Sequence, residues 1–519
     1  MIKSNFLVAV FVCAWCLPAP ALSSFDGITA AEDIQTQHDA DPNGAIGTKQ
    51  YLEWTNVALE AYDKVTFAPV WSSPHAGEWP WNNNANTPDC DGTAIHGDGF
   101  VVFDRLASRW VVGAHSTPPK GQSNYYYCIA VSNTDDLSSS SLAWYAYEFS
   151  LNPILGVNSK GVSYFPDWPK LATWGDAYYI GFDILDPSYN YAISGAGFCA
   201  LDRTNILNGT TANPMQCFKD GTYHPYLMHS PIPADVEGTT APPQGRDEFF
   251  LSIQNPPRDG KTLTTNALNL WDFHVDWANP ANSTFNHSQV SVPAYTPGCY
   301  TLAKPTDTVC VPQPGTKIGG GHFLIDSVAD RLMPRLAYRN FGSYESFLIS
   351  HTIKTGKGSN NETGVGWYEF RANGSGSPSL YQSGQFSPDP IFRFMPSMAQ
   401  DKVGNVAMGY SVANTKMHPG IRAIGWKLGS TQKKVEMIIQ NGGGDQENSA
   451  LWGDYTSMTV DPVDECTFWY VNEYLPSNES GKAISWHTRI ANFTVSGCAG
   501  KARIIEHPLE LVRSQANGK

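Results

Sequence analysis

The chain has 519 residues, and its 34 Lys and Arg against 48 Asp and Glu give a formal net charge of −14. This acidic balance, with no basic stripe along the sequence, argues against binding to a phosphate backbone, so we expect no nucleic-acid partner. After the N-terminal stretch, no segment is apolar enough to span a bilayer, so we expect no membrane span.

The first residues have the pattern of a secretory signal peptide. Lys3 precedes an apolar stretch at Phe6–Leu17, which is shorter than the roughly 20 residues of a membrane span. Small residues near Ser23 suit cleavage there. We therefore predict a signal peptide at 1–24 and a secreted, extracellular protein, with a buried N-terminal helix as the alternative.

The rest of the chain has the pattern of an all-β protein. Gly, Pro, Ser, Thr and Asn interrupt short apolar runs that are rich in Val, Ile, Phe, Tyr and Trp. These runs recur in six units, each with an apolar run, an Asp-containing turn and further runs. In chain order the units begin with Phe100–Ser116, Pro169–Ile184, Asp247–Asn255, Pro334–Thr352, Met395–Val412 and Leu451–Leu475.

Repetition of this kind predicts a radial architecture. A unit of three or four antiparallel strands has two apolar faces, and sheets arranged around an axis cover both. We predict one β-propeller domain over 25–498, followed by a polar C-terminal tail at 499–519. Six blades are the first choice, and a seventh would come from part of Ala278–Gly321.

The segment before the first unit alternates apolar and polar residues over Gln50–Val65. Alternation of this kind fits a strand better than a helix. We predict an outer N-terminal strand that closes the ring by pairing with the C-terminal blade near Ala483–Val495. A small N-terminal domain is the alternative.

Cysteine usage agrees with export. Of 10 cysteines, Cys13 and Cys16 lie in the predicted signal peptide, and the other eight include no C-x-x-C pair typical of structural zinc. An even number in a secreted chain indicates disulfides, and here neighbours in sequence lie near each other. The predicted pairs are Cys90–Cys128, Cys199–Cys217, Cys299–Cys310 and Cys466–Cys498.

N-glycosylation sequons are frequent. An N-x-[ST] triplet in a surface loop accepts a glycan in an exported eukaryotic protein. The seven sequons predict modification at Asn208, Asn282, Asn286, Asn361, Asn373, Asn478 and Asn492.

Several stretches, among them "FDRLASRWVV", "DRLMPRLAYRNFGSYES" and "WGDYTSMTVDPVDECTFWYVNEY", carry a resemblance to a known group. They resemble a largely uncharacterised family of secreted, loosely sialidase-like β-propeller proteins of bacteria and fungi. The similarity spans roughly Tyr51 to Cys498 and implies a propeller. The Asp-box repeat of true sialidases, S-x-D-x-G-x-T-W, does not occur in the sequence.

Residues just before the first strand of each blade converge on one face of a propeller. Here they are carboxylates, basic groups and aromatic rings, which suit a sugar because arginines clamp acidic groups and carboxylates accept from hydroxyls. The predicted catalytic residues are Asp98, Asp167, Asp454 and Tyr455. The predicted substrate-binding residues are His96, Lys170, Arg335, Arg393 and Trp452.

Each candidate also has a structural interpretation. Asp98 and Asp454 follow glycines and could cap turns. Trp452 could pack in the core, and Arg335 could belong to a buried ion pair.

We therefore predict a secreted carbohydrate-active enzyme that acts on a glycan at a central funnel, most simply a sialidase-like glycoside hydrolase. Such enzymes use two carboxyl groups or, in sialidases, a tyrosine nucleophile. One alternative is a polysaccharide lyase on uronates, with His96 and Tyr455 serving proton transfer and Arg335 or Arg393 neutralising charge. Another is a non-catalytic glycan-binding or adhesion propeller.

Cofactor and assembly predictions are sparse. No cofactor is required for this chemistry, although Ca²⁺ could bind Asp98, Asp167 and Asp454 because hard carboxylate oxygens suit it. We expect a monomer.

Overall fold

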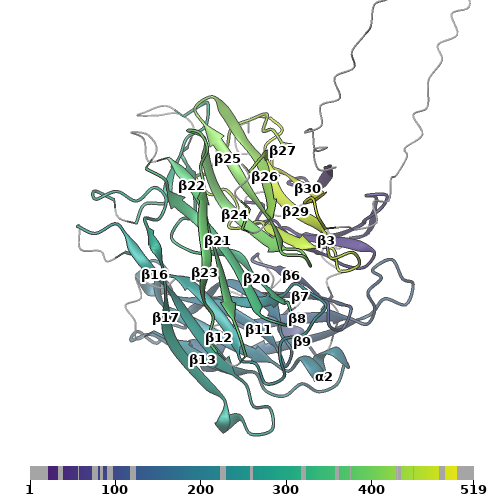
Figure 1. Ribbon diagram of the computed structural model, residues 1–519. Helices are drawn as coiled ribbons and strands as arrows, with labels where there is room; N and C mark the ends of the chain where they lie inside the picture. The colour runs from purple at the N-terminus through teal and green to yellow at the C-terminus, as the bar shows by residue number, and fades with distance from the viewer. Residues whose placement is uncertain are drawn as a thin grey trace, which may run out of the picture.

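The computed structural model describes residues 22–32, 39–56, 58–72, 80–81, 84, 86–90, 97–116, 118, 124–221, 230–256, 261–304, 306–316, 323–356, 362–374, 376–427, 429–430, 434–447, 449–477 and 485–498. The predicted signal segment up to residue 21 and the predicted tail at 499–519 lie outside these ranges. The described chain is all-β (Figure 1). No helix in the described part of the chain combines the length and the apolar character needed to cross a membrane.

Three four-stranded antiparallel sheets come first in the chain. The first contains β2 (Asn43–Ile46), β3 (Gln50–Trp54), β4 (Leu59–Asp63) and β5 (Pro69–Ser72). The second contains β6 (Phe100–Asp104), β7 (Arg109–Ser116), β8 (Tyr126–Ser132) and β9 (Trp144–Ser150). The third contains β10 (Phe165–Thr173), β11 (Tyr178–Asp186), β12 (Ala192–Leu201) and β13 (Gln216–Asp220).

The next two units are joined into one eight-stranded sheet by parallel pairing of β14 with β20, in which Ala234 lies opposite Leu336. The fourth unit contains β14 (Ile232–Val236), β15 (Glu248–Ile253), β16 (Thr265–His274) and β17 (Thr284–Tyr295). The fifth contains β20 (Met333–Asn340), β21 (Glu345–Lys354), β22 (Thr363–Ala372) and β23 (Ser379–Phe386). Between them, β18 (Val309–Val311) and β19 (Ile325–Asp326) form a two-stranded sheet.

Two further four-stranded units contain the remaining strands. The sixth contains β24 (Phe392–Gln400), β25 (Asn405–Asn414), β26 (Met417–Lys427) and β27 (Glu436–Gln440). The seventh contains β28 (Ser457–Val460), β29 (Thr467–Tyr474), β30 (His487–Thr494) and, from the other end of the chain, β1 (Ser23–Thr29). The helices are short, namely α1 (Asn152–Leu155), α2 (Arg203–Leu207), η1 (Pro88–Cys90), η2 (Pro187–Tyr189) and η3 (Pro280–Asn282).

Within the described ranges there are thus seven four-stranded units, whereas the sequence analysis favoured six. The additional unit is Asn43–Ser72 and does not come from Ala278–Gly321. The alternation of Gln50–Val65 belongs to two paired strands, β3 and β4, because the chain turns where the Thr55 N–H donates to the Ala58 carbonyl at 2.9 Å.

The strand that pairs with the last unit is also different from the predicted one. β1 runs antiparallel to β30, with Ser23 opposite Asn492 and Thr29 opposite His487. The predicted partner region near 483–495 is therefore right and the predicted strand at Gln50–Val65 is wrong. β1 starts two residues inside the segment predicted as signal peptide, 1–24.

The first strands of successive units contact one another. The contacts run β2–β6, β6–β10, β10–β14, β14–β20, β20–β24, β24–β28 and back from β28 to β2. In Figure 1 the purple β3 accordingly lies beside the yellow β29 and β30. This circuit brings residues from distant parts of the sequence to one common axis.

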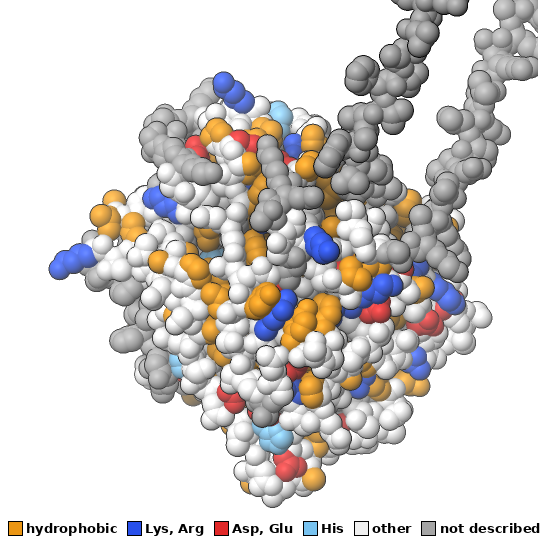
Figure 2. Space-filling model, in the orientation of Figure 1, with side chains coloured by type: hydrophobic (Ala, Val, Ile, Leu, Met, Phe, Trp, Pro, Cys, Tyr) orange, Lys and Arg blue, Asp and Glu red, His pale blue; other side chains and the backbone are white. Residues whose placement is uncertain are grey.

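Disulfides join the eight cysteines of the described chain. They are Cys90–Cys128, Cys199–Cys217, Cys299–Cys310 and Cys466–Cys498, the four predicted pairs. Each links positions at most 38 residues apart, so each staples a local part of the chain. On the face in view in Figure 2, Lys and Arg side chains are interspersed with acidic and apolar ones.

Charged side chains fill the axis. The guanidinium of Arg335, from β20, is 2 % exposed and donates to Asp235 Oδ2 at 2.6 Å and to Ser457 Oγ at 3.1 Å. It also donates to the carbonyl oxygens of Gly44 and Val101, at 3.0 and 2.5 Å. One side chain therefore ties the first, second, fourth and seventh units to the fifth.

Removing this guanidinium should destabilise the whole fold. We expect Arg335→Met to lower the free energy of unfolding by about 3–5 kcal/mol, because Asp235 would be left buried without its partner. The check is urea denaturation followed by tryptophan fluorescence.

Lys304→Met is the matched control, since Lys304 pairs with Asp307 on the surface at 2.7 Å, with 72 % of its side chain exposed. We expect it to change stability by under about 1 kcal/mol. Equal losses in the two variants would contradict the role given to Arg335.

Candidate functional site

A left-handed residue lies at or near the start of the first strand in every unit. Positive φ angles are rare outside glycine because Cβ crowds the following carbonyl, and they concentrate at functional sites. The residues are Asp41 (φ 45°), Asp98 (54°), Trp168 (55°), Ser230 (50°), Val328 (45°), Met395 (48°) and Gly453 (34°). The backbone therefore makes a similar bend seven times where the chain enters the axis.

Three carboxylates meet at these bends. Asp41, Asp98 and Asp454 each have one carboxylate oxygen within 4.8 Å of the others. The backbone N–H of Asp454 donates to Asp41 Oδ1 at 2.5 Å, which fixes the first unit to the seventh. Asp41 is buried, whereas Asp98 and Asp454 are partly exposed, so this carboxylate triad is reached from solvent through the last two.

A buried lysine lies against aromatic rings beside the triad. Lys170 is 1 % exposed, and its Nζ lies 3.7 Å from the ring centroid of Trp168 and 4.0 Å from that of Tyr455. The Tyr455 hydroxyl donates to Asp98 Oδ1 at 3.2 Å. These contacts connect the third unit to the second and seventh. They place two aromatic rings and an ammonium group together beside the triad.

Burial and mutual repulsion perturb the ionisable groups. Burial, with the charges of Asp98, Asp183 and Asp454, raises the pKa of Asp167 to about 8. Burial likewise raises the pKa of Asp454 to about 6, despite the opposing effect of Arg331. It lowers the pKa of Lys170 to about 8. Near neutral pH, Asp167 therefore keeps its proton while Asp454 has mostly lost its own.

The pKa of Asp41 is raised as well. Burial, together with the charges of Asp454 and Asp98, holds its pKa well above the usual range of a carboxyl group. Perturbed groups gathered at one place are typical of catalytic and binding sites. The cluster formed by Asp41, Asp98, Asp167, Lys170, Arg331, Asp454 and Tyr455, with the ring of Trp168, is named the axial cluster below.

Sequence reasoning placed five of these residues at the site and missed two charged ones. Asp98, Asp167, Lys170, Asp454 and Tyr455 were predicted, and the structure brings them together.

Asp41 and Arg331 were missed. Arg331 pairs with Asp330 at 3.1 Å, and its Cζ lies 5.0 Å from the Trp168 ring centroid. A residue followed by proline recurs near the axis in several units, and this pattern in the sequence could have indicated the positions of Asp41 and Arg331. The pairs are Asp41-Pro42, Trp168-Pro169, Ser230-Pro231, Met333-Pro334 and Met395-Pro396.

Arg335, predicted to bind substrate, is a structural residue in the next layer. Its partners Gly44, Val101 and Ser457 follow Asp41, Asp98 and Asp454 by three residues each. The guanidinium therefore lies beneath the triad, and its bonds to its own carboxylate and to backbone correct the predicted role.

Arg393 and Trp452 also have structural partners in place of the predicted substrate. The Arg393 side chain is fully buried and pairs with Asp389 and with Glu436, each at 2.9 Å. Trp452 is 2 % exposed and donates from Nε1 to Ser411 Oγ at 3.2 Å. His96, the remaining predicted binding residue, lies outside the described residues.

The triad has the chemistry of a cation site. Carboxylate oxygens within 4.8 Å of one another suit a hard cation such as Ca²⁺. The set differs from the predicted one, because Asp41 takes the place of Asp167. Ca²⁺ binding stays a prediction.

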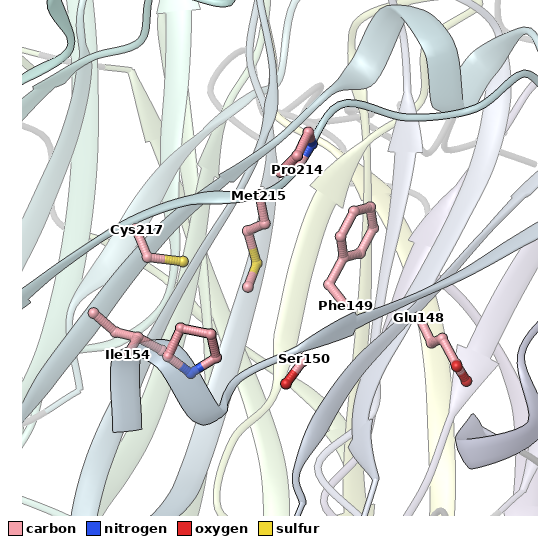
Figure 3. Close-up of a pocket in the computed structure, with 8 residues that line it drawn as sticks. Glu148, Phe149, Ser150, Ile154, Pro214, Met215 and Cys217 are labelled. Atoms are coloured by element: carbon pink, nitrogen blue, oxygen red, sulfur yellow. The ribbon is translucent and has the colours of Figure 1, made fainter. Parts of the chain in front are cut away.

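A separate groove of about 430 Å³ lies at the outer side of the second and third units (Figure 3). It is lined by Glu148, Phe149, Ser150, Pro153, Ile154, Pro214, Met215 and Cys217. Glu148 is the one acidic side chain among these residues, and Cys217 is held in a disulfide. The groove therefore lacks the paired ionisable groups of the axial cluster.

No protein-family model matches the sequence, and no curated protein matches it. Among solved structures, it is similar to the GH93 alpha-L-arabinofuranosidase of Fusarium graminearum at 8 % identity and a TM-score of 0.38, over 90 % of this chain and 97 % of that one. A subtype N10 neuraminidase-like protein from A/little yellow-shouldered bat/Guatemala has 11 % identity and a TM-score of 0.33, over 75 % and 96 %. An alpha-L-arabinofuranosidase from Lactobacillus brevis has 11 % identity and a TM-score of 0.31, over 68 % of this chain and 97 % of that one.

The raised pKa of Asp454 predicts how stability depends on pH. A carboxyl whose pKa is higher in the folded than in the unfolded chain stabilises the fold at low pH, and this contribution is lost as pH rises through the folded value. Asp454→Asn should therefore match the wild type near pH 4 and exceed its stability above pH 6, by about 3 kcal/mol, since the pKa rises from 3.8 to about 6 and each unit corresponds to about 1.4 kcal/mol. Thermal unfolding across this range measures the difference.

Asp136→Asn provides a control of opposite sign. Its hydrogen bond from Lys49 holds the pKa of Asp136 below the usual range, so the ionised form is stabilised by folding. This variant should lose stability at neutral pH and match the wild type in acid. A stability gain for Asp454→Asn that does not vary with pH would show that the burial of its charge is not the cause.

Proposed function

We propose that this chain is an exported glycoside hydrolase built as a seven-bladed β-propeller, with its active site at the axial cluster. The seven units serve as blades, and β1 completes the last of them. The observation that carries the proposal is the meeting of Asp98, Lys170 and Asp454, from three units separated in sequence, with the Tyr455 hydroxyl on Asp98.

The two perturbed carboxyls suit the two roles that glycoside hydrolysis needs. Asp167, protonated near neutral pH because its pKa is raised to about 8, can donate a proton to the leaving glycosidic oxygen. Asp454, with a pKa of about 6, is ionised at that pH and can deprotonate water or stabilise positive charge at the sugar. Environments that separate the pKa values of two carboxyls assign acid and base in this way.

Tyr455 and Lys170 act around these carboxyls. Tyr455 is 1 % exposed, and burial beside Asp98 and Asp41 holds its pKa well above its ordinary value. These properties favour a role for Tyr455 as the hydrogen-bond donor that positions Asp98. They argue against a role as a nucleophile of the sialidase kind. Lys170 reduces the repulsion among the carboxylates and can donate to a sugar hydroxyl.

The proposal favours a hydrolase over a lyase. A lyase on uronates needs a cation that neutralises the substrate carboxylate. Arg335 and Arg393, which the sequence offered for this role, are bound to carboxylates of their own. A non-catalytic glycan-binding propeller does not require an acid and a base with separated pKa values.

Export is part of the proposal. Four disulfides suit an oxidising compartment. Asn208, Asn282, Asn286 and Asn373 are exposed and remain predicted glycosylation sites, whereas Asn492 is partly buried within β30. Asn361 and Asn478 lie outside the described residues. A monomeric state also stays a prediction.

Replacing the proposed acid or base should slow turnover strongly. We expect Asp167→Asn and Asp454→Asn each to lower kcat by about 10²–10⁴-fold, the usual contribution of general acid–base catalysis. Release of reducing ends from a panel of neutral, amino and acidic glycans provides the measurement.

Asp247→Asn is the control for this experiment. Asp247 pairs with His274 at 3.0 Å in a partly exposed position outside the axial cluster, and we expect full activity. Wild-type protein that cleaves no glycan on the panel, or cluster variants as active as Asp247→Asn, would rule out the proposed function.

The pH dependence of kcat/KM should be bell-shaped. Ionisation of Asp454 sets an acid limb near pH 6, and loss of the Asp167 proton sets an alkaline limb near pH 8. Lys170 has a similar pKa, so Lys170→Gln tests which group causes the alkaline limb. We expect the variant to retain this limb, because Asp167 is the proposed acid. Initial rates from pH 4 to 10 measure both limbs, and a flat profile would contradict the assignment.

A further inference from the structure

Negative charge dominates the axial cluster and its surroundings. Two basic side chains, Lys170 and Arg331, face several carboxylates from different units. Asp167 lies directly opposite Asp183 across β10 and β11. The acidic groups are Asp41, Asp98, Asp167, Asp183, Asp326, Asp330 and Asp454, of which Asp41 and Asp167 have the strongly raised pKa values described above. An anionic ligand would enter a field of its own sign.

Buried arginines near the axis do not offset this charge at the mouth. An acidic sugar is usually held by a bidentate guanidinium. Four of the five buried arginines in the described structure have carboxylate partners: Arg246 with Glu345, Arg335 with Asp235, Arg339 with Glu465 and Arg393 with Asp389. The fifth, Arg422, donates to the Ile421 and Gln440 carbonyls and to Asn441 Oδ1. Arg331, the one at the mouth, is paired with Asp330. A substrate carboxylate would have to displace one of these bonds.

Two buried donors have hydrogen bonds left to make. An ammonium group has three N–H donors, yet Lys170 Nζ makes one hydrogen bond in the described structure, to the Pro169 carbonyl at 3.0 Å. The Trp168 indole is fully buried, and its Nε1–H has no partner there. Leaving such donors unsatisfied is costly. The Lys170 ammonium lies close enough to Asp98 and Asp454 to feel their charges, and this points to a ligand that supplies acceptors at this place.

The chemistry of that ligand follows from donors and acceptors together. A sugar hydroxyl both donates and accepts, so one hydroxyl can accept from Lys170 while it donates to an aspartate. A carboxylate only accepts and would meet the ionised Asp454 without a proton between them. A protonated amino group donates to several carboxylates and adds opposite charge.

We infer that the axial cluster takes neutral or positively charged sugars and excludes sialic and uronic acids. This inference rests on the proposed function and names its substrate class. It replaces the expectation from sequence that arginines clamp an acidic sugar, because Arg335 holds the units together and Arg393 is paired with Asp389 and Glu436.

Matched glycan pairs test the inference. Polygalacturonate is compared with its carboxyl-reduced form, and sialyllactose with lactose, so that each pair isolates the charged group. Chitosan oligosaccharides represent positively charged sugars. Binding to immobilised glycans and release of reducing ends are both measured at pH 7 in about 20 mM salt with the full chain.

We expect the uncharged member of a pair, or chitosan, to bind at least about tenfold more tightly than any acidic glycan. Acidic members that bind as well as their neutral partners would overturn the inference while leaving a hydrolase in place. Absence of binding and turnover with every glycan would instead remove the proposed function and this inference with it.

Discussion

The structure depends on a guanidinium buried at the axis. A buried charge is tolerated only when its hydrogen bonds are satisfied, and Arg335 meets this condition with acceptors from four other units. Those acceptors must lie at one level along the axis. Further along, Arg105 pairs with Glu237 and Arg339 with Glu465, at 2.7 and 2.9 Å. The ion pairs therefore fix the alignment of the sheets relative to one another along the axis.

This register determines the site above it. Gly44, Val101 and Ser457 are held at the level of Arg335, so the residues three positions earlier, Asp41, Asp98 and Asp454, must also share a level. The left-handed bends at the first two of these and at Gly453 then turn the backbone toward the axis. Three like charges would not gather without such a constraint, because their repulsion opposes it. The ion pairs below supply the geometry that the cluster needs.

The sequence was informative where function follows from local position. Asp98, Asp167 and Asp454 precede apolar runs, and the disulfides join nearby cysteines, so both could be predicted from the sequence alone. The unit at Asn43–Ser72 escaped because its strands are four or five residues long and their alternation is that of one longer strand. Partners distant in sequence were not accessible. Arg335 and Asp235 are 100 residues apart, and no local pattern indicates which carboxylate an arginine will meet.

Where the arginines bond determines the chemistry available at the mouth. Sequence composition supplies carboxylates and arginines alike, and either could have faced the ligand. The arginines at the lower levels bond to carboxylates and to backbone carbonyls that would otherwise be buried without partners, which anchors them in the fold. The carboxyl groups at the upper level are buried and also repel one another when ionised, and both effects, burial first, keep a carboxyl protonated to higher pH. The same division that stabilises the axis thus accounts for the proton donor that we propose at its mouth, and it leaves no unpaired guanidinium there among the described residues.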